Sequence, residues 1–302
     1  MPSSNSEGMV IHELVVISGK GGTGKTSVAA SLAVLAGESV LADCDVDAAD
    51  LHLILSPVIE QRHDFYSGRQ AVIRSADCVG CGDCKSYCRF DAVFLSEEGT
   101  HQPVYAVDPF ACEGCGVCVR FCPNKAIDFP ERLCGEWMTS STRYGPMVHA
   151  RLAAAAENSG KLVSLVRQEA RRIAEETGQR RILVDGPPGI GCPVIASLTG
   201  ASQVLAVTEP TLSGEHDLAR LLALTRHFNI PAAVCVNKYD IDVGMTERIE
   251  QAAVQAGAAV IGRIRYDRTV TRAQMQAKAV VETDSPAADD LRQIWSRLID
   301  QE

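Results

Sequence analysis

The sequence GKGGTGKT, at residues 19–26, decides the fold. It fits the phosphate-binding pattern G-x-x-x-x-G-K-S/T, and it separates an apolar run, HELVVIS at 12–18, from an Ala-rich segment that predicts a helix from about 24 to 36. In this context the glycines let successive backbone N–H groups turn toward phosphate oxygens at the N-terminus of a helix. The pattern therefore predicts a nucleotide site that opens an α/β domain.

The loop assigns roles to individual side chains. Lys25 is expected to reach the β phosphate of bound ATP or ADP and the γ phosphate of ATP, and the Thr26 hydroxyl is expected to bind Mg²⁺. The other residues expected to bind the nucleotide in this segment are Gly19, Lys20, Gly21, Gly22, Thr23, Gly24 and Ser27.

Later polar residues end predicted strands and agree with this site. Asp185 ends the run RRILVD, where its carboxylate is expected to bind Mg²⁺ at the carboxyl edge of the sheet. Asn237 ends the run AAVCVN and Lys238 follows it, so both are expected to contact the base. For these two residues an ordinary polar strand end remains the alternative.

Apolar runs and amphipathic segments alternate from residue 146 to the end of the sequence. Continuous apolar strands separated by helices predict a doubly wound, mainly parallel sheet that is covered on both faces. The alternation is interrupted from 59 to 145, where Cys, Gly, Asp and Pro are frequent and only short strands are expected. We therefore expect an α/β domain formed by 1–58 and 146–302, with an inserted domain at 59–145.

Two cysteine runs lie in this insertion, Cys78 to Cys88 and Cys112 to Cys122, and both follow C-x-x-C-x-x-C-x-x-x-C. In this pattern three thiolates hold one 4Fe-4S cluster and the fourth binds the other cluster. The sequence predicts a first cluster on Cys78, Cys81, Cys84 and Cys122, and a second on Cys112, Cys115, Cys118 and Cys88. Zinc prefers separated C-x-x-C pairs and fits less well. The expected role is electron transfer.

Composition limits the class of protein. The chain has 302 residues, 46% hydrophobic and 22% charged, as in soluble globular proteins. A net charge of -9 gives no general attraction for nucleic acid, which is not an expected partner. Neither a signal peptide nor a long apolar stretch is evident, so a cytoplasmic location without membrane insertion is expected.

With Lys20 just before the double glycine, the loop resembles the deviant Walker A loop of the MinD/ParA/nitrogenase-iron-protein class of P-loop ATPases. That resemblance implies a nucleotide-dependent homodimer in which Lys20 acts on the partner's ATP. The segment from Asp43 to Asp47 resembles the switch I of this class, which implies that Asp45 orients the attacking water and Asp43 supports Mg²⁺. The implied catalytic residues are Lys20, Lys25 and Asp45. Asp47 and Asp50 are expected to be solvated surface acids.

The whole chain resembles the MinD-superfamily ATPases with an inserted bacterial-ferredoxin-like domain of α+β type. The resemblance includes DGPPGIGCPVIASLTGA from 185 and TEPTLSGEHDLAR from 208. Three functions remain open. The first is ATP-gated electron transfer to an unidentified redox partner. The others are an iron-sulfur carrier of the Mrp type, although no cysteine follows Cys235, and a MinD/ParA-like positioning ATPase.

Four further cysteines, Cys44, Cys134, Cys192 and Cys235, are expected to pack as small apolar residues. Cys192 has an alternative, because nitrogenase iron protein carries a cluster ligand at the same offset from the aspartate that corresponds to Asp185. A further metal on Cys192, with or without Cys134, is therefore a second hypothesis.

Overall fold

The computed structural model describes residues 9–96, 103–153 and 159–301. The chain divides into two compact units. The first consists of Met1–His63, Trp137–Arg151 and Ser159–Glu302, and the second of Asp64–Glu136 and Leu152–Asn158. The boundaries at 63 and 136 fall inside two long strands, β3 (Val58–Arg69) and β8 (Glu131–Thr142). These strands therefore connect the two units along the chain.

A 9-stranded sheet, with the order β13-β12-β11-β1-β10-β2-β9-β8-β3, forms the centre of the first unit. Neighbouring strands from β13 to β9 pair in parallel. This confirms the predicted α/β fold with a mainly parallel sheet. Its remaining strands are β1 (His12–Ser18), β2 (Val40–Asp43), β9 (Gly145–Leu152), β10 (Arg181–Pro188), β11 (Gln203–Thr208), β12 (Ala232–Asn237) and β13 (Ala259–Ile264).

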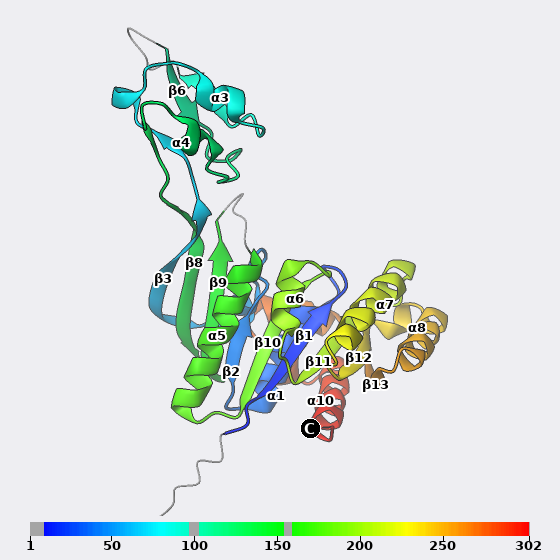
Figure 1. Cartoon of the computed structure of the whole chain (residues 1–302). Helices are drawn as coiled ribbons and strands as arrows, with labels where there is room; N and C mark the ends of the chain where they lie inside the picture. The colour runs from blue at the N-terminus through cyan, green and yellow to red at the C-terminus, as the bar shows by residue number, and fades with distance from the viewer. Residues whose placement is uncertain (1–8, 97–102, 154–158, 302) are drawn as a thin grey trace, which may run out of the picture. The chain divides into compact units, whose positions relative to one another are not determined.

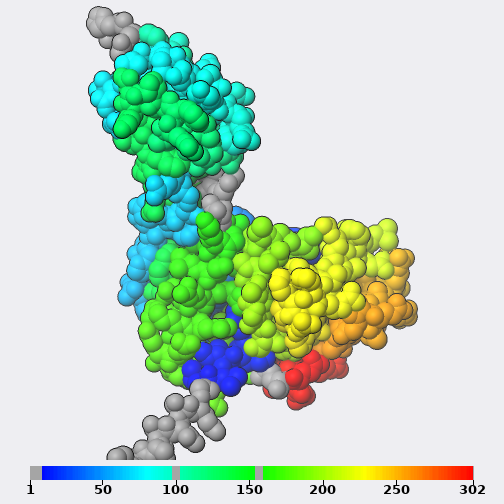
Figure 2. Space-filling view, viewed as in Figure 1, coloured from blue at the N-terminus to red at the C-terminus, as the bar shows by residue number. Residues whose placement is uncertain are grey.

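Helices cover both faces of this sheet, because its central strands are apolar on both sides. Leu14 and Val16 of β1 belong to one core with Val28 and Leu32 of the first helix and Ile294 of the last. Figure 1 shows α5, α6 and α7 in front of the strands, and Figure 2 shows how they close over that face. The α-helices of this unit are α1 (Lys25–Ala36), α2 (Leu51–Leu55), α5 (Ser159–Thr177), α6 (Cys192–Leu198), α7 (Leu212–His227), α8 (Val243–Gln255), α9 (Arg268–Met275) and α10 (Pro286–Ile299), and two 3-10 turns are η2 (Tyr239–Ile241) and η3 (Val280–Glu282).

The long strands β3 and β8 correct the expectation that only short strands lie between 59 and 145. Each has 12 residues, and β9, which begins at Gly145, pairs in parallel with β2. For β3 the prediction failed because the first seven residues of this edge strand are all exposed. A strand that is exposed on both faces has no alternation of polar and apolar residues, which is the signal that predicts strands.

The second unit is built from short elements around a small core that includes Ala71, Cys84, Val93 and Ile127. Two antiparallel pairs of strands frame two short helices that contact each other. Each cysteine run supplies one of these helices. The elements are β4 (Val72–Ile73), η1 (Ser75–Asp77), α3 (Asp83–Tyr87), β5 (Val93–Ser96), β6 (Val104–Val107), α4 (Val117–Phe121) and β7 (Ile127–Asp128).

Candidate functional site

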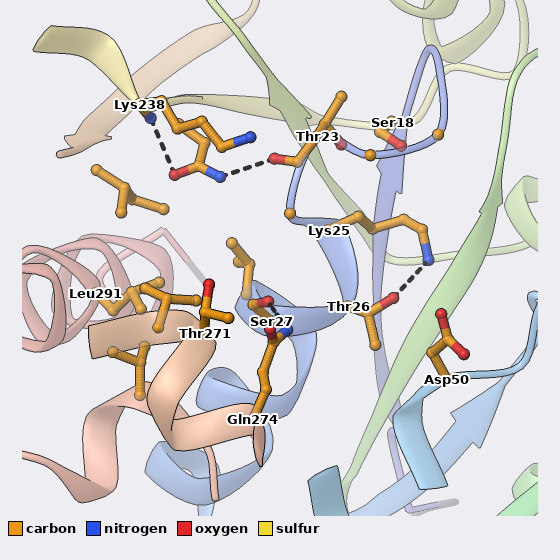
Figure 3. A pocket seen from close by; sticks show the side chains of 18 of the residues that line it. Ser18, Thr23, Lys25, Thr26, Ser27, Asp50, Lys238, Thr271, Gln274 and Leu291 are labelled. Atoms are coloured by element: carbon orange, nitrogen blue, oxygen red, sulfur yellow. Dashed lines mark hydrogen bonds between the residues drawn. The ribbon is translucent and has the colours of Figure 1, made fainter. Parts of the chain in front are cut away.

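A cavity of about 430 Å³ lies at the carboxyl ends of the central strands in the first unit. The loop between β1 and α1 forms one wall together with the first turn of α1, from Gly21 to Val28. Figure 3 shows Lys25 and Thr26 at this wall, with Asp50 nearby and Gln274 of α9 opposite Ser27. Parallel sheets bind ligands outside the carboxyl ends of their strands, so this cavity has the position expected of a nucleotide site.

The loop has a backbone shape that requires glycine at Gly24. Its φ is 85°, in the left-handed region, and a Cβ there would overlap the side-chain amide nitrogen of Asn237. That amide donates a hydrogen bond of 2.7 Å to the carbonyl of Thr23. Asn237 therefore fixes the loop from the end of β12 and also lines the cavity.

Lys25 joins two of the predicted acidic residues. Its Nζ lies 2.5 Å from Oδ1 of Asp185 and 3.4 Å from Oδ2 of Asp45. Nζ also donates a long hydrogen bond of 3.5 Å to Oγ1 of Thr26. Burial lowers the pKa of Lys25, but the nearby charges of Asp185 and Asp45 outweigh it and raise that pKa overall. The ammonium group therefore stays charged, as a phosphate ligand must.

Asp43, the register partner of Asp185 in the sheet, is fully buried. Its Oδ1 accepts a hydrogen bond of 3.2 Å from the backbone N–H of Asp45. In the described part of the chain no partner reaches Oδ2 of Asp43 or Oδ2 of Asp185. Burial, together with the charge of Asp185, raises the pKa of Asp43 well above its usual value. Burial likewise raises the pKa of Asp45, despite the neighbouring Lys25.

The donor set suits a hard divalent cation. One ammonium group faces three buried carboxyl groups, which a second cation would help to ionise, and oxygen ligands without partners are what Mg²⁺ binds. Asp43, Asp185 and Thr26 could hold such an ion. Asp47 and Asp50 are both exposed, as expected of surface acids, although Asp50 also lines the cavity.

The wall opposite the loop contains residues that the sequence analysis missed. Arg265, Tyr266 and Asp267 follow β13 and line the cavity beside Lys238. Gln274 of α9 donates a hydrogen bond of 2.7 Å to Oγ of Ser27. The sequence offered only their position, because Arg265, Tyr266 and Asp267 directly follow the last residue of β13, as Lys238 follows β12.

Lys20 does not line this cavity. Its Nζ donates hydrogen bonds to Oγ of Ser213 at 3.0 Å and to Oγ1 of Thr211 at 3.3 Å, at the start of α7. Glu209 is 3.9 Å from the same nitrogen and also forms an ion pair with Lys238. Lys20 therefore points away from the nucleotide position of its own chain.

A second cavity lies within the second unit and is lined by cysteines of both runs. Cys78, Cys81 and Cys84 come from the first run and Cys122 from the second. This is the set predicted for the first cluster. Its other walls include Ile73, Val79, Tyr105 and Ile127, so the surroundings are mainly apolar.

The remaining four cysteines of the runs also gather. Burial raises the pKa of the Cys118 thiol, and the thiols of Cys112, Cys115 and Cys88 lie near enough to add to that effect. They are the other three members of the second predicted set. Within the described residues no group of three His, Cys, Asp or Glu side chains could hold a single metal ion. A 4Fe-4S cluster spreads its thiolates over several irons, so single-ion geometry is not its criterion.

Local structure acts on the sulfurs of this site in two opposite ways. The backbone N–H of Ala126 donates a hydrogen bond of 3.3 Å to Sγ of Cys122, which stabilises a thiolate. Without a metal, burial raises the pKa of Cys84 to about 11. Thiolate ligands must lose their protons on binding, so these residues fit an iron-sulfur group that supplies compensating positive charge.

The sequence of the chain matches the profile of the CobQ/CobB/MinD/ParA nucleotide-binding domain over residues 14–280. The chain belongs to this family. An uncharacterised protein of Methanocaldococcus jannaschii is 32% identical over 232 residues, which are 76% of this chain and 79% of its own length. Another uncharacterised protein of the same organism is 26% identical over 250 residues, 81% of this chain and 86% of its own length.

Solved structures of MinD and McdA share the fold. The septum site-determining protein MinD of Pyrococcus horikoshii, complexed with Mg-ADP, has a TM-score of 0.57 at 15% identity and covers 96% of each chain. The cell division ATPase MinD of Pyrococcus furiosus has a TM-score of 0.56 at 16% identity and covers 96% of this chain and 99% of its own. Apo McdA of Cyanothece has a TM-score of 0.57 at 15% identity and covers 95% and 99%.

The four cysteines outside the two runs of this CobQ/CobB/MinD/ParA family member do not behave alike. Cys44 and Cys235 are fully buried in the first unit, as predicted. Cys134 is buried in the second unit, where its thiol donates a hydrogen bond of 3.1 Å to the carbonyl of Ser67. The packing prediction is wrong for Cys192, which is exposed because it begins α6 on the surface.

Proposed function

We propose that this protein is a Mg²⁺-dependent ATPase that couples ATP hydrolysis to electron transfer through two 4Fe-4S clusters in an inserted ferredoxin-type domain. One observation carries the proposal. Cys78, Cys81, Cys84 and Cys122 line a common cavity in a chain that has a family nucleotide site. Three thiolates from one run and the fourth from the other form the ligand pattern of paired 4Fe-4S clusters.

At the nucleotide site, Lys25 binds the β and γ phosphates in exchange for its contact with Asp185. Thr26, Asp43 and Asp185 hold Mg²⁺, and Asp45 orients the water that attacks the γ-phosphate and releases ADP and phosphate. Asn237 and Lys238 contact the base. This assignment is supported by the unpartnered oxygens of Asp43 and Asp185, and by the Mg-ADP bound to a MinD of the same fold.

At the cysteine site, each thiolate set binds one cluster, and the first set lies against mainly apolar walls. Bound clusters would supply one-electron transfer at low potential. In the first run the last cysteine is followed by Arg89, whereas in the second run Cys122 is followed by a proline. The two sites therefore differ beside their last ligand. Such neighbouring groups tune the potential of a cluster.

We further propose that two chains associate around ATP. Lys20 is the residue that supports this arrangement, because it does not line the cavity of its own chain and its contacts with Thr211 and Ser213 are exposed. Exchanging exposed hydrogen bonds for a contact with a partner's phosphate costs little. Nucleotide turnover would then be limited to the dimer.

The proposal is tested with reconstituted protein, an apo acceptor protein and ATP, while electron transfer and cluster transfer are followed in parallel. Electron transfer without loss of iron is expected. Transfer of stoichiometric iron to the acceptor contradicts the electron carrier and supports an iron-sulfur carrier. In the same assay Lys25→Ala should abolish ATP turnover and leave the cluster spectrum intact.

A second candidate is a positioning ATPase, which is favoured by the likeness to cell division proteins named MinD. No described helix is long and apolar enough to cross a membrane. The apolar side of α10 is also occupied, since Leu291, Ile294 and Leu298 belong to the core. This helix is therefore not free to bind a lipid surface. Vesicle sedimentation in the presence of ATP tests this candidate. Binding of the protein to the vesicles would support it.

A further inference from the structure

Two stacked aromatic rings lie on the surface of the second unit. Tyr87 and Phe121 have ring centroids 4.7 Å apart at an interplanar angle of 28°. They are 51% and 50% exposed, and each is the last residue of a short helix. Two adjacent exposed rings form a continuous apolar spot, and such a spot on a soluble protein marks an interaction site.

The internal repeat determines where these rings lie. Tyr87 and Phe121 occupy the same position of the two cysteine runs, one residue before the last cysteine of each. In the proposed ligation, Cys88 binds the second cluster and Cys122 the first. The pair therefore lies one residue from a ligand of each cluster, and a protein that covers both rings is close to both clusters.

Basic side chains accompany the rings. The segments KSYCRF at 85–90 and VRFCPNK at 119–125 contain no acidic residue. Their cations are all exposed, and within the described part of the chain none of them forms an ion pair; they are Lys85, Arg89, Arg120 and Lys125. In a chain with a net charge of -9, these two segments are positively charged, and Asp83 and Asp91 flank the first of them.

We propose that Tyr87, Phe121 and these four cations form the docking site of an electron-transfer protein with an acidic surface. This proposal rests on the proposed function. Aromatic rings and arginines are enriched in the contacts that dominate binding energy, and charge complementarity steers a partner to them. A second copy of this chain would present the same cations to this site, and like charges oppose that pairing.

The test uses the full iron-loaded chain and a small acidic FMN flavoprotein as the probe. Binding is measured by titration at two salt concentrations, and it should weaken at least tenfold from about 0.02 M to about 0.3 M salt. Arg89→Glu with Arg120→Glu should weaken it at least tenfold at low salt, and Tyr87→Ser with Phe121→Ser should do the same. Phe110→Ser is the matched control, because Phe110 is an exposed aromatic residue of the same unit outside the pair.

Three results would overturn the docking site. They are unchanged affinity in the charge-reversal variant, tighter binding of a basic haem protein than of the flavoprotein, and a dimer of the chain that Phe121→Ser dissociates. Iron content and reduction of methyl viologen, which needs no docking, are recorded for every variant. A wild-type chain that binds no iron refutes the proposed function and this site together. If the variants have normal iron content and normal viologen reduction and still bind the flavoprotein as the wild type does, the docking site alone is refuted.

Discussion

Asp43, the last residue of β2, and Asp185, which lies within β10, are register partners on two neighbouring parallel strands. Both are buried, and each has one carboxylate oxygen without a partner among the described residues. Two adjacent buried carboxylates repel each other unless a cation lies between them. The pair is therefore poised to bind a divalent ion, and it is a source of instability without one.

Replacing Asp43 should separate stability from function. Burial and Asp185 oppose ionisation of Asp43, so Asp43→Asn, which cannot ionise, should raise the stability of the metal-free protein by about 1 kcal/mol, or about 2–4 °C in Tm, at a pH where Asp43 would be charged. The same variant should no longer be stabilised by Mg²⁺ and ATP, because binding raises Tm only where the folded state holds the ligand. Thermal unfolding with and without Mg-ATP measures both effects. A metal-free variant less stable than the wild type would show that Asp43 has a structural partner.

Lys20 and Asp45 should complement each other in a mixture of variants. Lys20→Ala and Asp45→Ala are each expected to lose ATP turnover, while Lys20→Ala alters the stability by less than about 0.5 kcal/mol because its contacts are exposed. In a mixed dimer the site that retains Asp45 receives Lys20 from the other chain. Random mixing should then restore roughly a quarter of the wild-type rate. No recovery at any mixing ratio would mean that Lys20 acts within its own chain.

Pairs of cysteine substitutions should reveal which run supplies the fourth ligand. Cys78→Ser with Cys122→Ser damages one cluster if ligation is interleaved, so half of the iron should remain. Cys112→Ser with Cys122→Ser damages both, so nearly all of the iron should be lost. Iron analysis after anaerobic reconstitution measures the difference. The opposite pattern, with half of the iron kept by the second pair, would assign each cluster to a single run.

Gly114 should be required for the loop of the second cysteine run. Its φ is 63°, and a Cβ there would overlap the backbone carbonyl oxygen of Arg69. Gly114→Ala should therefore destabilise the second unit by about 2–3 kcal/mol, more than the 1–2 kcal/mol of left-handed strain alone. Gly178→Ala is the control, because its φ is 73° and nothing lies within 4 Å of that Cβ. Calorimetry and iron retention on heating measure the stability of both variants. Equal losses of stability in the two would show that the carbonyl of Arg69 moves aside.

The sequence was most informative where a function depends on short-range spacing. The phosphate loop and the alternation of apolar strands predicted the family fold, because a βα turn and a buried strand are recognisable from a few residues. Strand β3 was missed, since an edge strand exposed on both faces lacks the alternation that indicates a strand. Arg265 and Asp267 were missed because they reach the nucleotide cavity only after β13 has joined the sheet.

The sequence by itself determined that this chain has a phosphate loop, buried parallel strands and two repeated cysteine runs. Only the tertiary structure decided that Asp43 and Asp185 meet, that Cys122 joins Cys78 in one cavity, and that Lys20 turns toward α7. The physical reason is one of range. Motif spacing is fixed by the covalent chain over a few residues, whereas these contacts depend on strand order and on the packing of segments far apart in sequence.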